Sequence, residues 1–213
     1  HANNEDALRW SASNGYLDVV KYLVEEHQAD IHECALRWSA SNGHLEVVKY
    51  LASKGADIHA DNEYALKRSA ENGHFEVVKY LVEEHNADIH AENEYALKRS
   101  ASNGHLHVVK YLVDEHQADI HADNEYALKR SAENGHLHVV KYLVEKGADI
   151  HADNDFSLRW SAGNGHLHVV KYLVSKGASV DKISRSTFIR LIKINASEDA
   201  EFIVQYFPKT VVN

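Results

Sequence analysis

The sequence predicts an all-α fold, a solenoid of stacked helix–turn–helix units joined by short loops. The first observation is a repeated phrase, which reads NGHLHVVKYLV at Asn134–Val144 and occurs in six near copies in all. The glycines of these copies are Gly15, Gly43, Gly73, Gly104, Gly135 and Gly165, so the steps between them are 28, 30, 31, 31 and 30 residues. A fixed period of this length is the signature of a repeat array. The second observation is that each copy holds two short amphipathic stretches, and neither can bury its apolar face without a neighbouring unit.

The third copy illustrates both helices of a unit. NEYALKRSAEN at Asn62–Asn72 opens with a potential capping residue, continues with Leu66 and Ala70 four positions apart, and stops at Gly73. The stretch HFEVVKYLVEEH over 74–85 alternates apolar and charged positions at helical spacing. Its apolar face consists of Phe75, Val78 and Val82. We therefore expect a helix, a tight glycine turn and a second helix in every copy.

The second helix is predicted to end in two ways. Three copies place a glycine where a left-handed C-cap is needed, namely Gly55, Gly147 and Gly177. The other three copies carry one extra residue and place Gln28, Asn86 or Gln117 near this point. Asparagine tolerates the left-handed conformation, and we expect the two glutamines to adopt it less readily.

A short polar connector, ADIHADN or a close variant, links the units, and its Asp and Asn residues suit a turn. The connector into the second unit is the exception. Its sequence, IHECALRW at Ile31–Trp38, lacks three residues relative to IHADNEYALKR. We expect this connector to be visibly shorter than the others.

The period divides the chain into six repeats and a tail. The repeats cover residues 1–30, 31–57, 58–88, 89–119, 120–149 and 150–180. Residues 181–213 are interpreted as a degenerate seventh repeat and C-terminal cap, with helices over 184–195 and 201–207. HANNEDALRW at His1–Trp10 aligns with HADNEYALKR at His59–Arg68, so the chain begins inside a repeat. We expect it to be the C-terminal part of a longer array.

Composition narrows the class of protein. The formal net charge is −9, from 32 acidic and 23 basic residues, which argues against a nucleic-acid partner. No run approaches 18 apolar residues, so we expect no membrane-spanning helix, and the start carries no signal-peptide pattern. Cys34 is the only cysteine, which excludes an intrachain disulfide and fits a reducing intracellular setting.

The repeat resembles the ankyrin repeat, a helix–turn–helix unit of about 33 residues. The matching residues are NGH, VV and L over Asn134–Leu143, followed by GADI at Gly147–Ile150, and six copies agree. Two features depart from the family: its TPLH opening is replaced by YALK, as at Tyr64–Lys67, and the connector is about three residues shorter. The lost Thr and His remove hydrogen bonds that usually brace the first helix, so we expect stubbier finger loops.

The wording ALRWSA–NGHLEVVKYLVEKGADIHADN also resembles the ankyrin arrays of giant DNA viruses of the mimivirus type. That resemblance implies a viral protein that acts inside an infected host cell, in the host cytoplasm. The partner it implies is a host or viral protein.

The most variable first-helix position is the candidate partner-binding site. It consists of Trp10, Trp38, Arg68, Arg99, Arg130 and Trp160. In the ankyrin family this position lies on or near the concave face, where partners dock. Trp and Arg are enriched at binding hot spots, and Arg flanked by Trp suits a peptide with acidic and apolar groups. The alternative is that each side chain packs only against its equivalent in the next repeat.

The basic residue just before this position follows an acidic residue by four positions in every repeat. The pairs are Glu5/Arg9, Glu33/Arg37, Glu63/Lys67, Glu94/Lys98, Glu125/Lys129 and Asp155/Arg159. This is the favourable order on a helix, about 0.2–0.5 kcal/mol for each pair. We therefore predict that the three lysines are neutralised in place, which further disfavours a nucleic-acid groove.

Metal binding and catalysis find little support. The pairs His105/His107, His136/His138 and His166/His168 cannot chelate one ion, because residues two apart on a helix are about 200° apart. No phosphate-binding loop or nucleophile elbow occurs, and Cys34 has only His32 nearby without a third group. We predict no metal, no cofactor, no small-molecule substrate and no enzymatic activity.

Three functions are compatible with these observations. The first is a non-enzymatic scaffold that binds a partner protein through its first-helix face and connector tips. The second is a substrate-recruiting adaptor of a ubiquitin ligase, as in poxviral ankyrin proteins, although the tail aligns better as another repeat. The third is a structural or virion component that assembles through the ends of the array.

Overall fold

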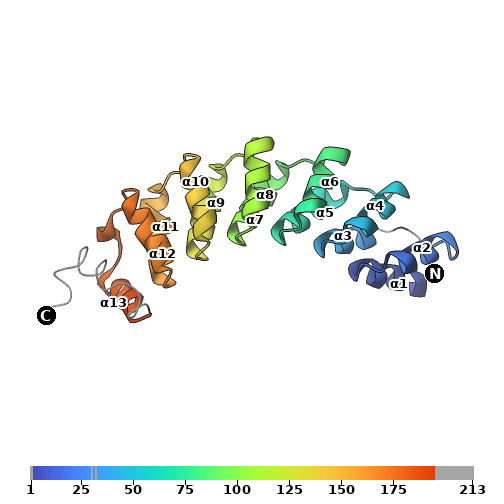
Figure 1. Cartoon of the computed structure of the whole chain (residues 1–213), viewed down its shortest axis with the longest axis horizontal. Helices are drawn as coiled ribbons and strands as arrows, with labels where there is room; N and C mark the ends of the chain where they lie inside the picture. The colour runs from blue at the N-terminus through green and yellow to red at the C-terminus, as the bar shows by residue number, and fades with distance from the viewer. Residues whose placement is uncertain (1, 30, 32, 195–213) are drawn as a thin grey trace. The chain divides into compact units, whose positions relative to one another are not determined.

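The computed structural model describes residues 2–29, 31 and 33–194 (Figure 1). It divides into two compact bodies, His1–Ser100 with His107–Ala118, and Ala101–Leu106 with Asp119–Asn213. Each body is described by itself below, as the N-terminal and the C-terminal body. All regular secondary structure in the described residues is helical, which confirms the predicted fold class.

The helices occur in pairs that follow the repeats. The N-terminal body contains α1 (Ala2–Ser13), α2 (Leu17–Glu25), α3 (Glu33–Ser41), α4 (Leu45–Ser53), α5 (Ala60–Glu71) and α6 (Phe75–His85). The next pair is α7 (Ala91–Ser102) and α8 (Leu106–Lys110), which continues as the π-helical turn η1 (Tyr111–Glu115). The C-terminal body contains α9 (Ala122–Glu133), α10 (Leu137–Glu145), α11 (Ala152–Gly163), α12 (Leu167–Ser175), η2 (Val180–Lys182) and α13 (Arg185–Ile194).

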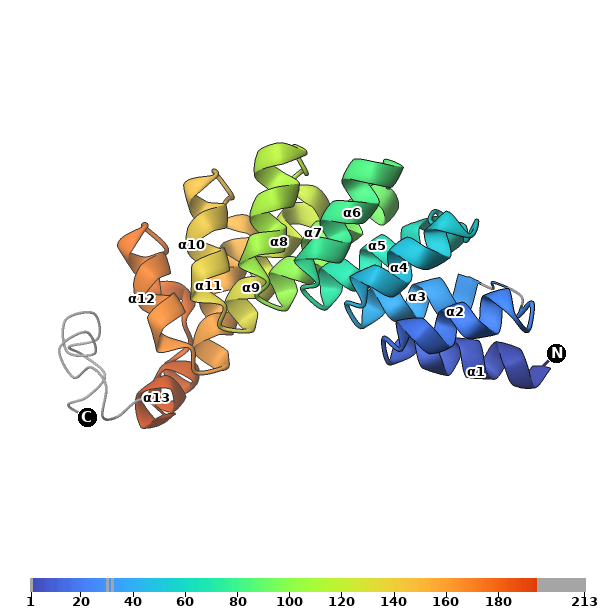
Figure 2. The same ribbon diagram turned by 45° about the vertical axis from the view of Figure 1, so that its right-hand side comes forward.

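First helices and second helices form separate layers within each body. In the N-terminal body α1, α3 and α5 pack side by side, and α2, α4 and α6 form the other layer (Figure 2). In the C-terminal body α9 packs on α11, and α10 packs on α12. Each helix is only two or three turns long, so its stability depends on these neighbours rather than on its own propensity.

A leucine from each helix forms the centre of the core. The leucines with at most 1% exposure are Leu8, Leu36, Leu66, Leu97, Leu128 and Leu158 from first helices, Leu51, Leu81, Leu112, Leu143 and Leu173 from second helices, and Leu191 from α13, while Leu23 of α2 is 9% exposed. Burial of one such side chain contributes about 1.5–3 kcal/mol. The period in the sequence is thus the period of the core.

The glycine turn is constrained in two ways, as Gly135 shows. Its φ is +80°, a conformation that residues with a Cβ adopt at a cost. A Cβ placed there would also lie 2.6 Å from Nδ1 of His166, which belongs to the next repeat. The turn of one repeat is therefore the surface on which the histidine of the next repeat rests.

The connectors differ from the prediction. Instead of Asn62 capping a helix, Asp61, Asn62 and Glu63 are all left-handed, with φ of 50°, 55° and 63°. The same three positions are left-handed at 92–94, 123–125 and 153–155. Asp and Asn tolerate this region because their short side chains bond locally, but a left-handed Glu is uncommon. An ion pair with His59 stabilises this conformation of Glu63.

The shortened connector has no such turn. Helix α3 begins at Glu33 and does not contain the left-handed stretch that opens α5, α7, α9 and α11. Residues 30 and 32 of this connector lie outside the described residues, so its shorter length stays a prediction.

The glutamine C-caps also differ from expectation. Gln28 and Gln117 are left-handed, with φ of 46° and 58°, just as Asn86 is at 53°. In all three repeats the preceding histidine packs on the tyrosine five residues earlier. The pairs are Tyr22–His27, Tyr80–His85 and Tyr111–His116, with ring centroids 4.8, 5.0 and 4.6 Å apart. This ring contact accompanies the extra residue and fixes the end of the helix whichever residue follows.

The tail packs on the sixth repeat. Helix α13 contacts α11 and buries Phe188 and Leu191. A Cβ at Gly165 would lie 3.2 Å from Ile194 Cδ1, so Ile194 covers this turn as histidines cover the others. The second predicted tail helix, over 201–207, lies outside the described residues.

Candidate functional site

The six predicted partner-binding residues lie at one position of the first helices, and we call this set the first-helix face. Each is substantially exposed. Trp10, Trp38 and Trp160 are 61%, 50% and 44% exposed, and the side chains of Arg68, Arg99 and Arg130 are 39%, 41% and 41% exposed. Large exposed tryptophans are unusual, because this residue is normally buried on average.

The arginines of this face are held in place. Arg68 donates to Glu71 Oε2 at 2.5 Å, and its guanidinium lies 5.2 Å from the ring centroid of Tyr64. Arg130 repeats both contacts with Glu133 and Tyr126, and Arg99 lies 5.3 Å from the ring of Tyr95. Planar stacking and charge-assisted bonds reduce the rotamer freedom lost when a partner binds.

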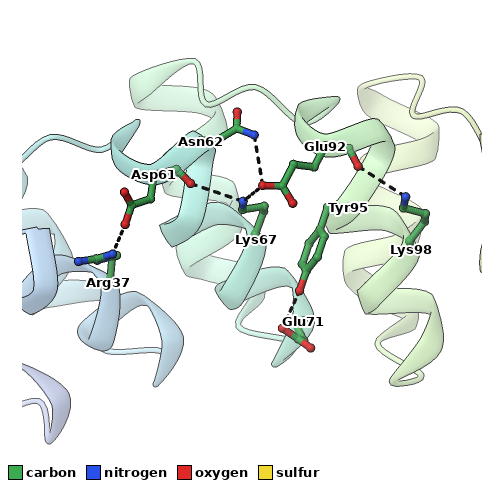
Figure 3. A network of polar contacts seen from close by, with 8 residues as sticks. All are labelled: Arg37, Asp61, Asn62, Lys67, Glu71, Glu92, Tyr95 and Lys98. Atoms are coloured by element: carbon green, nitrogen blue, oxygen red, sulfur yellow. Dashed lines mark hydrogen bonds and ion pairs between the residues drawn. The ribbon is translucent and has the colours of Figure 1, made fainter.

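A ladder of ion pairs runs beside this face and corrects one prediction (Figure 3). The basic residue of a first helix pairs with an acidic residue of the next connector, not with the acid four positions earlier. The pairs are Arg37–Asp61, Lys67–Glu92 and Lys129–Asp153. Pairing between an acid and a base four residues apart requires both to lie in one regular helix. The acids of four predicted pairs instead lie in left-handed turns, namely Glu63, Glu94, Glu125 and Asp155.

Further polar contacts fasten the ladder. Asn62 Nδ2 donates to Glu92 Oε1 at 3.2 Å, and Asn124 donates to Asp153 Oδ1 at 2.8 Å. The hydrogen bond from Lys67 holds the pKa of Glu92 below its usual value, and Lys129 does the same for Asp153. Lys67 and Lys129 are therefore neutralised, as predicted, but by the following repeat, and Figure 3 shows this for Lys67.

A histidine–carboxylate pair occupies each full connector. The distances from Nδ1 to the carboxylate are 2.7 Å in His59–Glu63, 2.5 Å in His90–Glu94 and His121–Glu125, and 2.7 Å in His151–Asp155. The carboxylate side chains are only 4–8% exposed, whereas the rings are 52–59% exposed. The hydrogen bond to Glu63 raises the pKa of His59, and that to Glu125 raises the pKa of His121. These pairs stabilise the left-handed turn.

Sequence reasoning missed these pairs. The available signal was the spacing HADNE, in which a histidine and an acid stand four apart in four consecutive connectors. The backbone N–H of the same histidine also donates to the aspartate two residues earlier, at 2.9 Å for His59 and Asp57. Both contacts brace the start of the first helix, in place of the hydrogen bonds that the Thr and His of the family's TPLH opening usually make.

The turn histidines and asparagines bind backbone carbonyls of the preceding repeat. His44 Nε2 donates to Ser13 O at 2.9 Å, and His74 Nε2 donates to Ser41 O at 2.9 Å. The equivalent asparagine bonds are Asn42 to Ser13 O, Asn72 to Ser41 O, Asn134 to Ser102 O and Asn164 to Glu133 O, at 2.7–2.9 Å. Carbonyls at the end of a helix have no partner within that helix, so these bonds satisfy them and join neighbouring repeats.

Burial lowers the pKa of two turn histidines, His136 and His166. A neutral ring with a protonated Nε2 fits the donor role toward a carbonyl. The turn histidines thus act as scaffold, which is the role inferred from the near-constant phrase in which they occur.

Two small pockets adjoin the tryptophans. One, of about 270 Å³, is lined by Arg9, Trp10, Ser13 and Trp38. The other, of about 320 Å³, lies beside Trp160 and is lined by Arg159, Trp160, Gly163, Lys182, Ile183, Ser184 and Thr187. Trp160 also stacks on Phe156, with ring centroids 5.2 Å apart.

Two remaining features bear on chemistry. In the described part of the chain no group of three or more His, Cys, Asp or Glu residues could hold a metal ion. Cys34 accepts a hydrogen bond from Arg37 Nη2 at 3.2 Å, while its predicted neighbour His32 lies outside the described residues.

Among the described helices, none is both long enough and apolar enough to cross a membrane.

Helix pairs that recur along the chain and pack in two layers within each body define a helical-repeat solenoid protein. The family model for ankyrin repeats in three copies matches residues 1–62, 36–124, 66–154 and 97–184. These matches span well over half of the chain, so the protein belongs to the ankyrin-repeat family. No curated protein matches the chain.

Proposed function

We propose that the protein is a non-enzymatic scaffold that binds a partner protein through its first-helix face. Ankyrin repeats are generally protein–protein interaction modules. The observation that carries the proposal is that exposed Trp and Arg side chains occupy the same first-helix position in both bodies, with the arginines fixed by neighbouring acids and tyrosines. Trp and Arg anchors on a rigid surface give affinity at a low ordering cost.

The proposed setting is intracellular. The resemblance to giant-virus arrays supports a viral protein in the cytoplasm of its host, with a host or viral protein as the partner. Recruitment of substrates to a ubiquitin ligase is a narrower version of the same binding role, and ligase components among the captured proteins would support it.

Affinity purification followed by mass spectrometry tests the proposal. The tagged chain is compared with a Trp38→Ala/Arg99→Ala variant and with Glu76→Ala, which changes an exposed residue on a second helix. We expect one or more proteins to be captured by the wild type and by Glu76→Ala but not by the double variant. Equal capture by all three chains would overturn the proposed face.

A second candidate function is association through the exposed apolar surface of α2, and one observation favours it. Val19 is 45% exposed and Tyr22 is 56% exposed, whereas the valines equivalent to Val19 are at most 1% exposed. Those valines are Val47, Val77, Val108, Val139 and Val169. Sedimentation of the wild type and of Val19→Glu/Tyr22→Glu tests this candidate. It requires that the wild type associates with rising concentration and that the variant stays monomeric.

A further inference from the structure

The pocket between the first two repeats combines aromatic and cationic side chains. It is lined by Arg9, Trp10, Ser13 and Trp38, and its volume of about 270 Å³ is just below the range for drug-sized ligands. Trp10 and Trp38 are the two most exposed tryptophans of the chain, at 61% and 50%. Two indoles beside a guanidinium form a site for a single side chain with its neighbouring polar group.

The shortened connector explains why this pocket contains an available cation. In the next two repeats the basic residue of the first helix meets an acid from the following connector, as in Arg37–Asp61 and Lys67–Glu92. The connector after Arg9 lacks the three residues that would supply this acid. Arg9 instead bonds Asp6 in its own helix, at 3.0 Å.

The bond to Asp6 is easily exchanged. The two side chains are 53% and 72% exposed, and a surface pair of this kind contributes about 0–1 kcal/mol. By contrast, Lys67 in the ladder is only 10% exposed. A carboxylate from a partner can therefore replace Asp6 on Arg9 at little cost.

The equivalent position in the sixth repeat lacks this freedom. Arg159 donates through Nε to Asn154 O at 2.9 Å and through Nη2 to Asp153 O at 3.0 Å, and Trp160 stacks on Phe156. The guanidinium and the indole are both engaged inside the repeat. The first two repeats are therefore the better place for an anchor.

We propose that this pocket binds a peptide segment in which an Asp or Glu stands beside a large apolar residue. The partner's carboxylate takes the place on Arg9 that the missing connector acid would have filled, and the apolar side chain packs between Trp10 and Trp38. Guanidinium and carboxylate match as a two-bond fork, which selects a carboxylate over an amide. This inference rests on the proposed function and names the chemistry of the partner.

A peptide-display selection tests the inference directly. A random linear library is selected on the immobilised full chain, and enriched peptides are synthesised together with versions in which each acid is replaced by its amide. Binding is read from tryptophan fluorescence. We expect enrichment of an acid next to Phe, Leu, Ile or Trp, and about a tenfold or greater loss of affinity in the amide version.

Variants locate the site. Arg9→Gln and Trp38→Ala each weaken binding about tenfold or more, Arg9→Lys retains part of the affinity, and Arg159→Gln, the matched change in the sixth repeat, leaves it unchanged. Unchanged melting curves establish that Arg9→Gln and Trp38→Ala remain folded, as expected for exposed residues. If peptides bind equally well to both variants but lose affinity in Arg99→Ala, the inference is wrong and the proposed face stands. If no variant of the face alters binding, both are wrong.

Discussion

The two ends of each first helix join neighbouring repeats by different chemistry. At the connector end the contact between repeats is ionic, through the ladder of Lys67–Glu92 and its equivalents, and the connector also holds an internal ionic pair such as His59–Glu63. At the turn end they are neutral, through Asn and His donors on backbone carbonyls, as with His74 on Ser41. One repeat interface therefore contains a part whose stability depends on salt and pH and a part whose stability depends on close packing.

The shape-dependent end allows the least change. Gly135→Ala is expected to destabilise the chain by about 3 kcal/mol or more, because left-handed strain is added to a clash with the ring of His166. Gly147→Ala is the matched control, since its φ is +101° but nothing lies within 4 Å of the added Cβ. It should cost only about 1 kcal/mol. Urea denaturation measures both, and equal losses would mean that the ring contact is unimportant.

Removing a turn hydrogen bond should have the next largest effect. His74→Ala removes the Nε2 bond to the Ser41 carbonyl, which keeps Asn72 Nδ2 as a donor, and is expected to cost about 1 kcal/mol. His138→Ala, on the outer side of the second helix of the fifth repeat, is the control and should stay within about 0.5 kcal/mol of the wild type. Thermal or urea unfolding distinguishes the two, and similar values would contradict the structural role of the turn ring.

The pH dependence of stability should have opposite signs at the two ends. The pKa of His59 and of His121 is raised, so their stabilisation is complete below the unfolded value of about 6.5 and is lost as pH rises through the folded pKa. The pKa of His136 and of His166 is lowered, so their stabilisation is complete above about 6.5 and is lost as pH falls toward the folded pKa.

Urea denaturation across this pH range checks both signs. His59→Asn/His121→Asn should differ from the wild type most on the acid side, and His136→Asn/His166→Asn most on the alkaline side. A difference that does not change with pH in either variant would show that the rings act without changing their protonation.

The ladder should give the smallest effect and the clearest dependence on salt. A double-mutant cycle of Lys67→Ala and Glu92→Ala is expected to give a coupling of about 0.5–1 kcal/mol, which falls at high salt. The turn bond of His74 should not respond to salt. A salt-independent coupling would indicate that Lys67 acts through its packing near Tyr95 rather than through charge.

The fold could be predicted from the sequence because Gly, Val and Leu recur at a fixed period, so that six units have the same apolar face to bury. The exposed placement of the Trp and Arg positions was expected from the resemblance to the ankyrin family. The ladder could not be predicted, because the rule of four applies within a helix, and nothing local revealed that Asp61–Glu63 is left-handed. The partners of Lys67 and Lys129 lie in the next repeat, at separations of 25 and 24 residues.

The ionic and neutral contacts also give the stack a direction. At the connector end the donors Arg37 and Lys67 belong to one repeat and the acceptors to the following repeat, whereas at the turn end His44 and His74 donate to the preceding repeat. Two repeats placed with like sides together would oppose base to base and carbonyl to carbonyl, or acid to acid and donor to donor. The interface is therefore heterologous and not self-complementary, so two copies of the same end cannot form this contact, and growth by it is head to tail.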